Sequence, residues 1–209
     1  RVRLDTEWRP DSLLRFFAML LFCFGMSGIA GYWLNRGIEA GFPLDEKTGI
    51  ILINVFFLDF GIFLITWNLL KEHSLSWKDA FGFSSDKLGG MAVLGSLTAV
   101  GGFFMAAMVG ALITAAFEAM NIEVSAQEVV NTFQNAEHVS QRILLGLMAV
   151  IFAPFVEELL FRGILFTTLQ QYLPRWIAVW GSAIFFGLVH ANMVSLIPLT
   201  LLAVLLTRL

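Results

Sequence analysis

Charged residues are scarce in this sequence. Only 14% of its 209 residues are Asp, Glu, Lys or Arg, whereas 58% are hydrophobic. Soluble globular domains contain roughly 25% charged residues, so this shortage argues against a soluble protein. The formal net charge of −3 and the lack of a basic stripe argue against a nucleic-acid partner. Cys23 is the only cysteine, so the chain cannot form an internal disulfide.

Long apolar runs dominate the rest of the sequence. A helix that crosses a bilayer needs about 20 mainly apolar residues. Runs of this kind predict membrane helices at 13–34, 48–70, 91–117, 143–170, 176–192 and 196–207. We therefore expect an all-α, polytopic transmembrane bundle with at least six membrane segments.

These segments are expected to form one membrane domain over 1–209. Its parts are the N-terminal helices and loops, 1–142, and the core helices, 143–209. Because the first residue is Arg1 and the sixth apolar run is short, we expect the sequence to be a portion of a longer protein.

Lysine and arginine are distributed unevenly between the connections. If the N-terminus is cytoplasmic, nine of them lie inside and only Arg36, Lys47 and Arg142 lie outside. Such a bias sets the orientation of membrane proteins. We therefore predict a cytoplasmic N-terminus. We also expect the protein to be multi-pass in the bacterial inner or plasma membrane.

Two connections carry additional patterns. In 71–90, aromatic residues alternate with charged ones, as in a segment that lies at the membrane interface. In the later connection, Ser125 and Glu128 have the spacing of a capping box, which starts a helix by satisfying its first free N–H groups. This predicts a surface helix over 125–141.

Three ionisable residues, Glu157, Glu158 and Arg162, lie in the fourth apolar run. Each costs about 2.5–3.5 kcal/mol at the bilayer centre, so all three must be paired, hydrated or functional. At about 100° per residue, Glu158 and Arg162 share a helix face and can pair, whereas Glu157 points elsewhere and needs another partner. Pro154 can kink the helix and open room for water beside Glu157.

The next apolar run contains a candidate partner for Glu157. Phe186 and His190 are four residues apart and share a face, and His190 is the only histidine in a predicted span. A carboxylate can take a proton from water, and an imidazole can orient that water or return the proton. A structural role for His190, hydrogen-bonded in the core, is the simpler alternative.

Other hydrolase signatures are absent from the sequence. It contains no His-Glu-x-x-His zinc motif and no Gly-x-Ser-x-Gly elbow. A metal site of Glu157, Glu158 and His190 is an open alternative with fewer ligands than usual. We predict neither a metal nor another cofactor.

Asp59 is a further carboxylate within an apolar run. One interpretation is a buried hydrogen-bonding or charge partner, for example of Arg162. The other is a carboxylate that contacts substrate or relays protons. The sequence does not decide between them.

The motif Glu157-Glu158-x-x-x-Arg162, followed by Phe186-x-x-x-His190, resembles the CAAX-protease and bacteriocin-processing family of intramembrane glutamic endopeptidases. The resemblance is strongest over 143–192. It implies a helical fold with a water-filled cavity. Some members trim prenylated C-termini, and bacterial relatives are linked to peptide maturation or self-immunity.

The resemblance also implies roles for individual residues. Glu157 would activate the attacking water and His190 would assist, while Glu158, Arg162, Phe186 and Asn192 would support the site. The family usually has a further His-x-x-x-Asn in a later helix, but residues 191–209 contain no histidine. We expect that motif to lie beyond Leu209; the alternative is that the protein has lost it, which would favour a protein without catalytic activity.

The sequence thus predicts a metal-independent intramembrane endopeptidase that cleaves a membrane-associated peptide or protein. One alternative is a catalytically silent scaffold or assembly factor of the same fold, with a partner in a larger membrane complex. A small proton-coupled transporter is the third, although the inverted repeats typical of transporters are not detectable.

Overall fold

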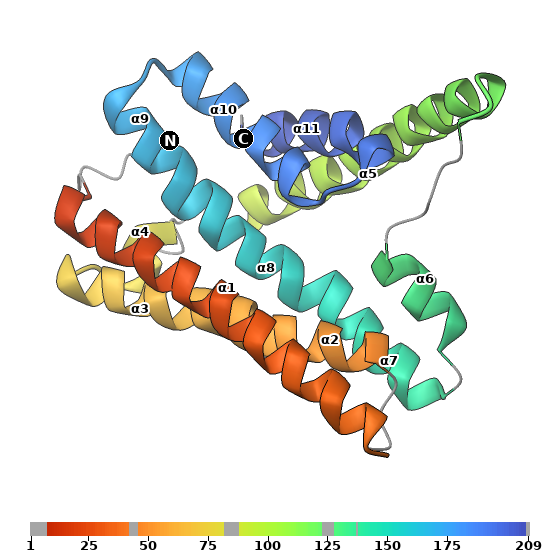
Figure 1. Ribbon diagram of the computed structural model, residues 1–209. Helices are drawn as coiled ribbons and strands as arrows, with labels where there is room; N and C mark the ends of the chain where they lie inside the picture. Colours follow the sequence, from red (N-terminus) through yellow and green to blue (C-terminus); the bar gives the residue numbers. More distant parts are fainter. Residues whose placement is uncertain (1–7, 42–45, 82–87, 123–127, 137, 208–209) are drawn as a thin grey trace. The chain divides into compact units, whose positions relative to one another are not determined.

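The computed structural model describes residues 8–41, 46–81, 88–122, 128–136 and 138–207, and within this part every regular element is a helix (Figure 1). Four helices are long and apolar enough to cross a membrane: Pro10–Glu39, Thr48–Glu72, Val93–Ala119 and Gln141–Tyr172. Arg175–Val189 and Met193–Thr207 are shorter apolar helices. The predicted all-α class is therefore confirmed, and the six helices match the six predicted runs. The chain is an integral membrane protein.

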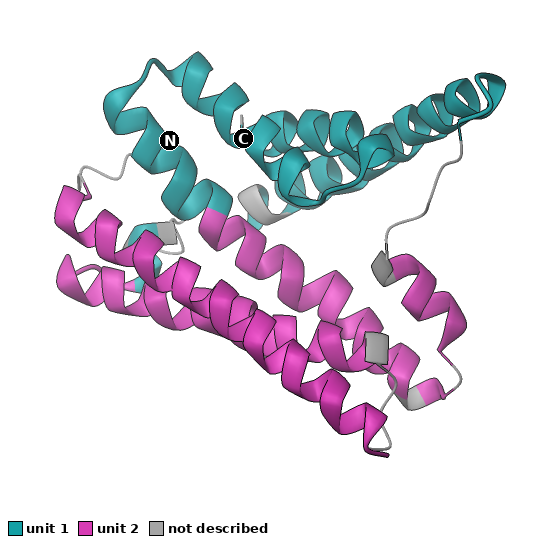
Figure 2. Ribbon diagram, in the orientation of Figure 1, with its two compact units in different colours: residues 1–3, 77–125, 161–209 teal, residues 4–76, 126–160 magenta. Residues whose placement is uncertain are grey.

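The chain divides into two compact units, shown in different colours in Figure 2. Unit 1 comprises residues 1–3, 77–125 and 161–209, and unit 2 comprises 4–76 and 126–160.

In unit 2, α1 (Pro10–Glu39) packs along a second long helix. That helix runs through α2 (Glu46–Asn54), the π-helical η1 (Val55–Phe60) and α3 (Gly61–Glu72). α1 begins with proline, which suits a first turn because its missing N–H would have no partner there. The apolar side chains between the two helices are buried: Leu13, Phe16, Ile62, Ile65 and Leu69.

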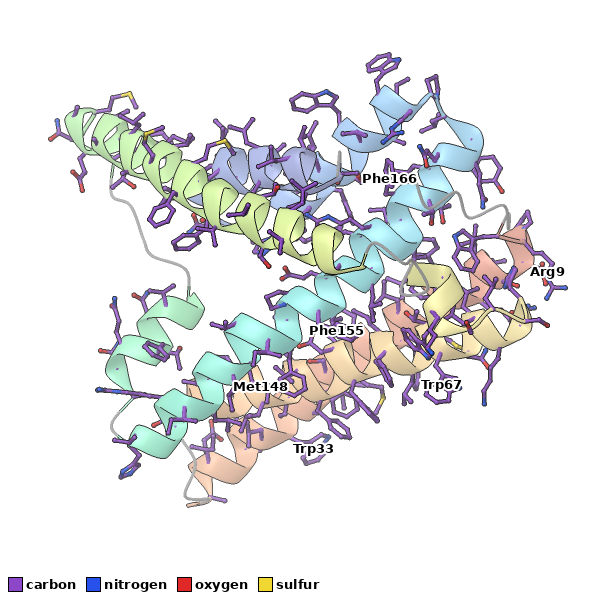
Figure 3. All side chains as sticks on the ribbon, turned by 180° about the vertical axis from the view of Figure 1, so that it is seen from behind. Arg9, Trp33, Trp67, Met148, Phe155 and Phe166 are labelled. Carbon is purple, nitrogen blue, oxygen red and sulfur yellow. The ribbon has the colours of Figure 1, made fainter. Side chains whose placement is uncertain are left out.

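Polar contacts join the ends of α1 and α3. The guanidinium of Arg15 lies 3.0 Å from the carboxylate of Glu72, and the backbone N–H of Arg9 donates to Nε2 of His73 over 3.2 Å. Farther along, the Ser27 hydroxyl donates to Oδ1 of Asn54. Figure 3 labels Arg9 and Trp67 at the polar end of this helix pair. These contacts fix the register of the pair, because a shift would leave each polar group without its partner.

The remainder of unit 2 holds α6 (Glu128–Asn135), α7 (Val139–Leu147), the π-helical η2 (Met148–Phe152) and α8 (Ala153–Glu157). The predicted surface helix over 125–141 is wrong in extent. α6 ends at Asn135, and the carbonyl of Ala136 accepts a hydrogen bond from Nε of Arg142, which belongs to the next helix. Ser125 lies outside the described residues.

Unit 1 is built around α10 (Arg175–Val189) and α11 (Met193–Thr207), which form a helical hairpin. α5 (Leu88–Ala119) packs on α11, and a Cβ at Gly102 would lie 2.6 Å from Cδ1 of Leu202. Small residues therefore allow these helices to approach closely.

Unit 1 also contains α4 (Trp77–Phe81), α9 (Thr167–Tyr172) and most of the π-helical η3 (Glu158–Phe166). α4 occupies part of the connection predicted to lie at the interface. A short connection separates the fourth and fifth apolar helices, since α9 ends at Tyr172 and α10 begins at Arg175.

Candidate active site

Glu157 is the last residue of α8, a short α-helical stretch between two π-helical ones, η2 and η3. Its side chain is half-buried and belongs to unit 2. Pro154 lies near the start of α8, directly after η2. A proline inside a helix loses one N–H and its ring collides with the carbonyl four residues before it. The wider turns of η2 lie where this collision would occur and accommodate the ring.

The π-helical geometry changes the expected relation of Glu158 to Arg162. From Glu158 to Phe166 the backbone follows a π-helix with i→i+5 hydrogen bonds, so the spacing of 100° per residue does not describe this stretch. Glu158 is exposed and Arg162 is half-buried. Their predicted ion pair, which would join unit 2 to unit 1, stays a prediction.

Asp59 lies on the neighbouring membrane helix of unit 2. It belongs to η1, and η1 packs against α8. The carboxyl group of Asp59 is half-buried. Unit 2 therefore places side by side two helices that each carry a carboxyl group and that lie about a hundred residues apart in the chain.

Phe186 is the centre of the site residues in unit 1. It is 5% exposed, and its ring meets that of Phe161 edge to face, with centroids 5.0 Å apart. The guanidinium carbon of Arg162 lies 5.0 Å from the centroid of the Phe186 ring, within the range of a cation–π contact. Arg162 of the Glu-Glu-x-x-x-Arg motif thus contacts the aromatic ring of the Phe-x-x-x-His motif.

His190 is held by Phe186 in two ways. Their ring centroids are 4.8 Å apart, and Nδ1 of His190 lies 2.8 Å from the carbonyl oxygen of Phe186. A carbonyl oxygen only accepts hydrogen bonds, so Nδ1 carries the proton. In the neutral ring Nε2 then holds the lone pair, because the hydrogen bond of one ring nitrogen sets the state of the other.

The prediction that His190 lies within a membrane helix is wrong in detail. α10 ends at Val189, and His190 occupies the position after it. Ala191 follows with φ of 48°, a left-handed conformation that is uncommon for a residue with a side chain. The helix ends here because this residue turns the chain back toward α11.

Asn192 caps the next helix. Its Oδ1 accepts the backbone N–H of Ser195 over 3.0 Å, as a side chain at the N-terminus of a helix commonly does. Gly187, about one turn before His190, lies against α11. A Cβ added at Gly187 would lie 2.5 Å from Oγ1 of Thr200. The position of His190 therefore depends on the tight α10–α11 hairpin.

The structure thus groups the predicted site residues into two sets. Unit 2 holds Glu157 and Glu158, and unit 1 holds Arg162, Phe186, His190 and Asn192. The first set offers carboxylate oxygens, and the second an imidazole nitrogen, a guanidinium and an amide. Among the described residues, no group of three or more His, Cys, Asp or Glu side chains is arranged to hold a metal ion.

Two features of the site were missed in the sequence. Phe161 precedes Arg162 and packs on Phe186, but a phenylalanine in a run of apolar residues carries no distinguishing signal. The left-handed Ala191 was also missed, because glycine or asparagine is the usual sign of such a turn.

Comparison with known proteins gives one family match. Residues 139–209 match the family described as Type II CAAX prenyl endopeptidase Rce1-like. No curated protein and no solved structure matches the chain. The matched range is about a third of the sequence and contains both motifs. Over this range the chain is similar to the Rce1-like CAAX endopeptidases, and the resemblance inferred from its Glu-Glu-x-x-x-Arg and Phe-x-x-x-His motifs is confirmed.

Proposed function

We propose that this protein is an intramembrane endopeptidase in which Glu157 activates water and His190 assists it. The observation that carries the proposal is the hydrogen bond between Nδ1 of His190 and the carbonyl of Phe186. It places the lone pair of a neutral imidazole on Nε2, the nitrogen that would accept a hydrogen bond from the attacking water. Similarity to the Rce1-like endopeptidases over 139–209 supports the same reaction class.

The reaction proceeds by proton transfers that balance. The Glu157 carboxylate takes a proton from a water molecule, and Nε2 of His190 accepts a hydrogen bond from the remaining O–H of that water. The water oxygen attacks the scissile carbonyl carbon and forms a tetrahedral intermediate. Glu157 then returns its proton to the leaving amine as the C–N bond breaks, which restores the carboxylate. No metal or other cofactor takes part.

Glu158, Arg162, Phe186 and Asn192 support the two reacting side chains. The Arg162 cation against the Phe186 ring, and that ring against His190, connect the motif helix with the imidazole. Asn192 caps α11 and so stabilises the hairpin on which His190 lies. A preorganised site of this kind reduces the movement needed at the transition state.

The substrate is a membrane-associated peptide or protein. The name of the matching family points to a prenylated C-terminus as the first substrate to examine. The protein itself would be multi-pass in a bacterial inner membrane or a plasma membrane, with its N-terminus in the cytoplasm.

Cleavage assays in proteoliposomes test the proposal. A farnesylated peptide with three residues after the modified cysteine, its unmodified counterpart and a helical membrane peptide serve as probes. We expect Glu157→Gln and His190→Ala each to lower kcat/KM about 10²–10⁴-fold, the range for loss of a general base or its partner. Undiminished cleavage by both variants would sink the mechanism.

Exposed residues of the same types provide matched controls. Glu118→Gln and His138→Ala change a carboxylate and an imidazole that are exposed and lie outside the site, so they should cleave like the wild type. A wild-type protein that is folded yet cleaves none of the three peptides would favour the scaffold alternative.

A further inference from the structure

A groove lies between α6 and the helix formed by α7 and η2, which Figure 1 shows side by side. Its volume of about 400 Å³ is in the range of small-molecule sites. Phe133 of α6 lies across the groove from Gly146 of α7, where an added Cβ would be 3.7 Å from the phenylalanine ring. All the lining residues belong to unit 2, so the groove is a property of one compact unit.

Apolar side chains line this α6–α7 groove along its length. Ile143, Leu147 and Val150 are among them, and each is exposed. They belong to the helix Gln141–Tyr172, which is long and apolar enough to cross a membrane. Lipid chains are as apolar as these side chains and cover them in a bilayer. The groove therefore offers an acyl chain a concave surface in place of a smooth helix face.

Arg142 is the only charged residue among the described residues that line the groove. Its Nε donates to the carbonyl of Ala136 over 2.9 Å, which ties the guanidinium to the segment between α6 and α7. Arg142 is also the second residue of the apolar span, so it lies where the hydrocarbon of the bilayer gives way to the headgroups. The groove is thus apolar along its length and cationic at its headgroup end.

We propose that the α6–α7 groove binds one phospholipid with an anionic headgroup. The lipid phosphate binds the guanidinium of Arg142, a group whose planar fork matches phosphate oxygens. One acyl chain follows the groove from Ile143 to Val150. From Arg142 to Val150 the helix rises roughly 12 Å, close to half of the ~30 Å hydrocarbon core. The groove therefore has the depth of the acyl chains of one leaflet.

Charge selects among the ligands that carry a phosphate. A zwitterionic lipid would bring a second positive charge toward Arg142, whereas an anionic lipid brings only the opposite charge. A free phosphate would leave the apolar length of the groove unused. An anionic phospholipid is the one of these ligands that complements both parts of the site.

Native mass spectrometry of the purified full chain in detergent tests the headgroup end. The probes are phosphatidylglycerol and phosphatidylcholine with identical acyl chains. We expect one phosphatidylglycerol to bind about fivefold more tightly than phosphatidylcholine, the factor for one cation beside an anionic lipid. Arg142→Gln should remove this preference, and Arg142→Lys, which keeps the charge, should retain it. Equal binding of the two lipids by the wild type would overturn the proposal.

Arg36 provides the matched control for Arg142. It is an exposed cation in the last turn of α1. Arg36→Gln removes the same charge and should keep the wild-type preference for phosphatidylglycerol. If Arg36→Gln and Arg142→Gln lose the preference equally, the net charge of the protein and not this groove selects the lipid, which would refute the site.

Gly146→Leu tests the acyl-chain end. The added side chain fills the groove beside Phe133 and should weaken binding of both lipids about tenfold, the effect of uncovering about two methylene groups. Val150→Trp, at an exposed lining residue, should act in the same way. Gly28→Leu is the control, because a Cβ at this position on α1 meets nothing within 4 Å. Wild-type binding by both groove variants would overturn the placement of the acyl chain.

Two competitors distinguish the lipid from other occupants. A large excess of inorganic phosphate, and separately the farnesylated peptide, should leave phosphatidylglycerol bound. Displacement by phosphate would show an anion site without an acyl chain, and displacement by the peptide would assign the groove to substrate. Either result would overturn the lipid site. Binding is measured without cleavage, so the outcome does not depend on the proposed function.

Discussion

The carbonyl oxygen of Phe186 lies 2.8 Å from Nδ1 of His190, one helical turn farther along the chain. The same phenylalanine presents its ring edge to face against the imidazole, with centroids 4.8 Å apart. The spacing of four residues in the Phe-x-x-x-His motif therefore has a physical reason, because one residue orients the histidine through its backbone and through its side chain.

The first prediction concerns the tautomer of His190. Because a carbonyl accepts the hydrogen bond from Nδ1, the neutral ring should carry its proton on that nitrogen. Nitrogen-15 NMR of histidine-labelled protein, with His190→Gln used to assign the signal, should show the Nδ1–H form. A signal from the Nε2–H form would contradict the proposed orientation of the imidazole.

The second prediction concerns the Phe186 ring. Phe186→Ala removes a buried ring that contacts Phe161, Arg162 and His190, and it should lower the free energy of unfolding by about 3–5 kcal/mol. Phe185→Ala is the matched control, because the neighbouring ring is 51% exposed. Thermal unfolding of both variants in one detergent should show a much smaller loss of unfolding free energy for Phe185→Ala. Equal losses of stability in the two variants would mean that the Phe186 ring contributes no more to the packing of unit 1 than the exposed Phe185 ring.

The third prediction concerns the α10–α11 hairpin. At Gly187 a Cβ would lie 2.5 Å from Oγ1 of Thr200 and 2.8 Å from the carbonyl oxygen of Leu196. Gly187→Ala should therefore force the helices apart and destabilise the protein by about 1–3 kcal/mol. At Gly181, on the same helix, the nearest atom would be 3.8 Å away, so Gly181→Ala should be neutral or slightly stabilising.

The hairpin substitutions also have a functional readout. Since His190 follows α10 directly, Gly187→Ala should disturb the His190 NMR signal and Gly181→Ala should leave it unchanged. An undisturbed signal in both variants would show that the position of His190 does not depend on the hairpin.

The fourth prediction concerns orientation in the membrane. Cys23 is the only cysteine, so a Cys23→Ser background allows single cysteines to be placed at will. With the N-terminus inside, a membrane-impermeant maleimide should label His138→Cys in intact spheroplasts. Ser76→Cys should react only after permeabilisation. The reverse pattern would overturn the orientation inferred from the lysine and arginine bias.

The membrane helices could be predicted from composition alone. A run of about 20 apolar residues has few alternatives to a helix in a bilayer, since every backbone polar group must find its partner within the segment. The family resemblance also came from sequence, since its motifs need only residue identity and spacing.

The details of the site needed the tertiary structure. The side-chain directions expected from ideal α-helical geometry do not apply after Glu157, because the π-helical turns that begin at Glu158 do not follow a spacing of 100° per residue. The end of α10 at Val189 was missed, because the turn depends on a left-handed alanine and not on a glycine. The pairings of Glu157 with His190 and of Glu158 with Arg162 stay predictions.

Asp59 shows most clearly what the sequence determines and what only the tertiary structure decides. The free-energy cost of placing this carboxyl group in a membrane can be inferred from the sequence, because it follows from the apolar residues on both sides of Asp59. The helix that packs beside Asp59 is not evident from the sequence, because α8 lies about a hundred residues away and no local pattern links the two segments. Only the tertiary structure shows that η1, which carries Asp59, packs against α8, since contacts between distant segments depend on how whole helices fit against each other.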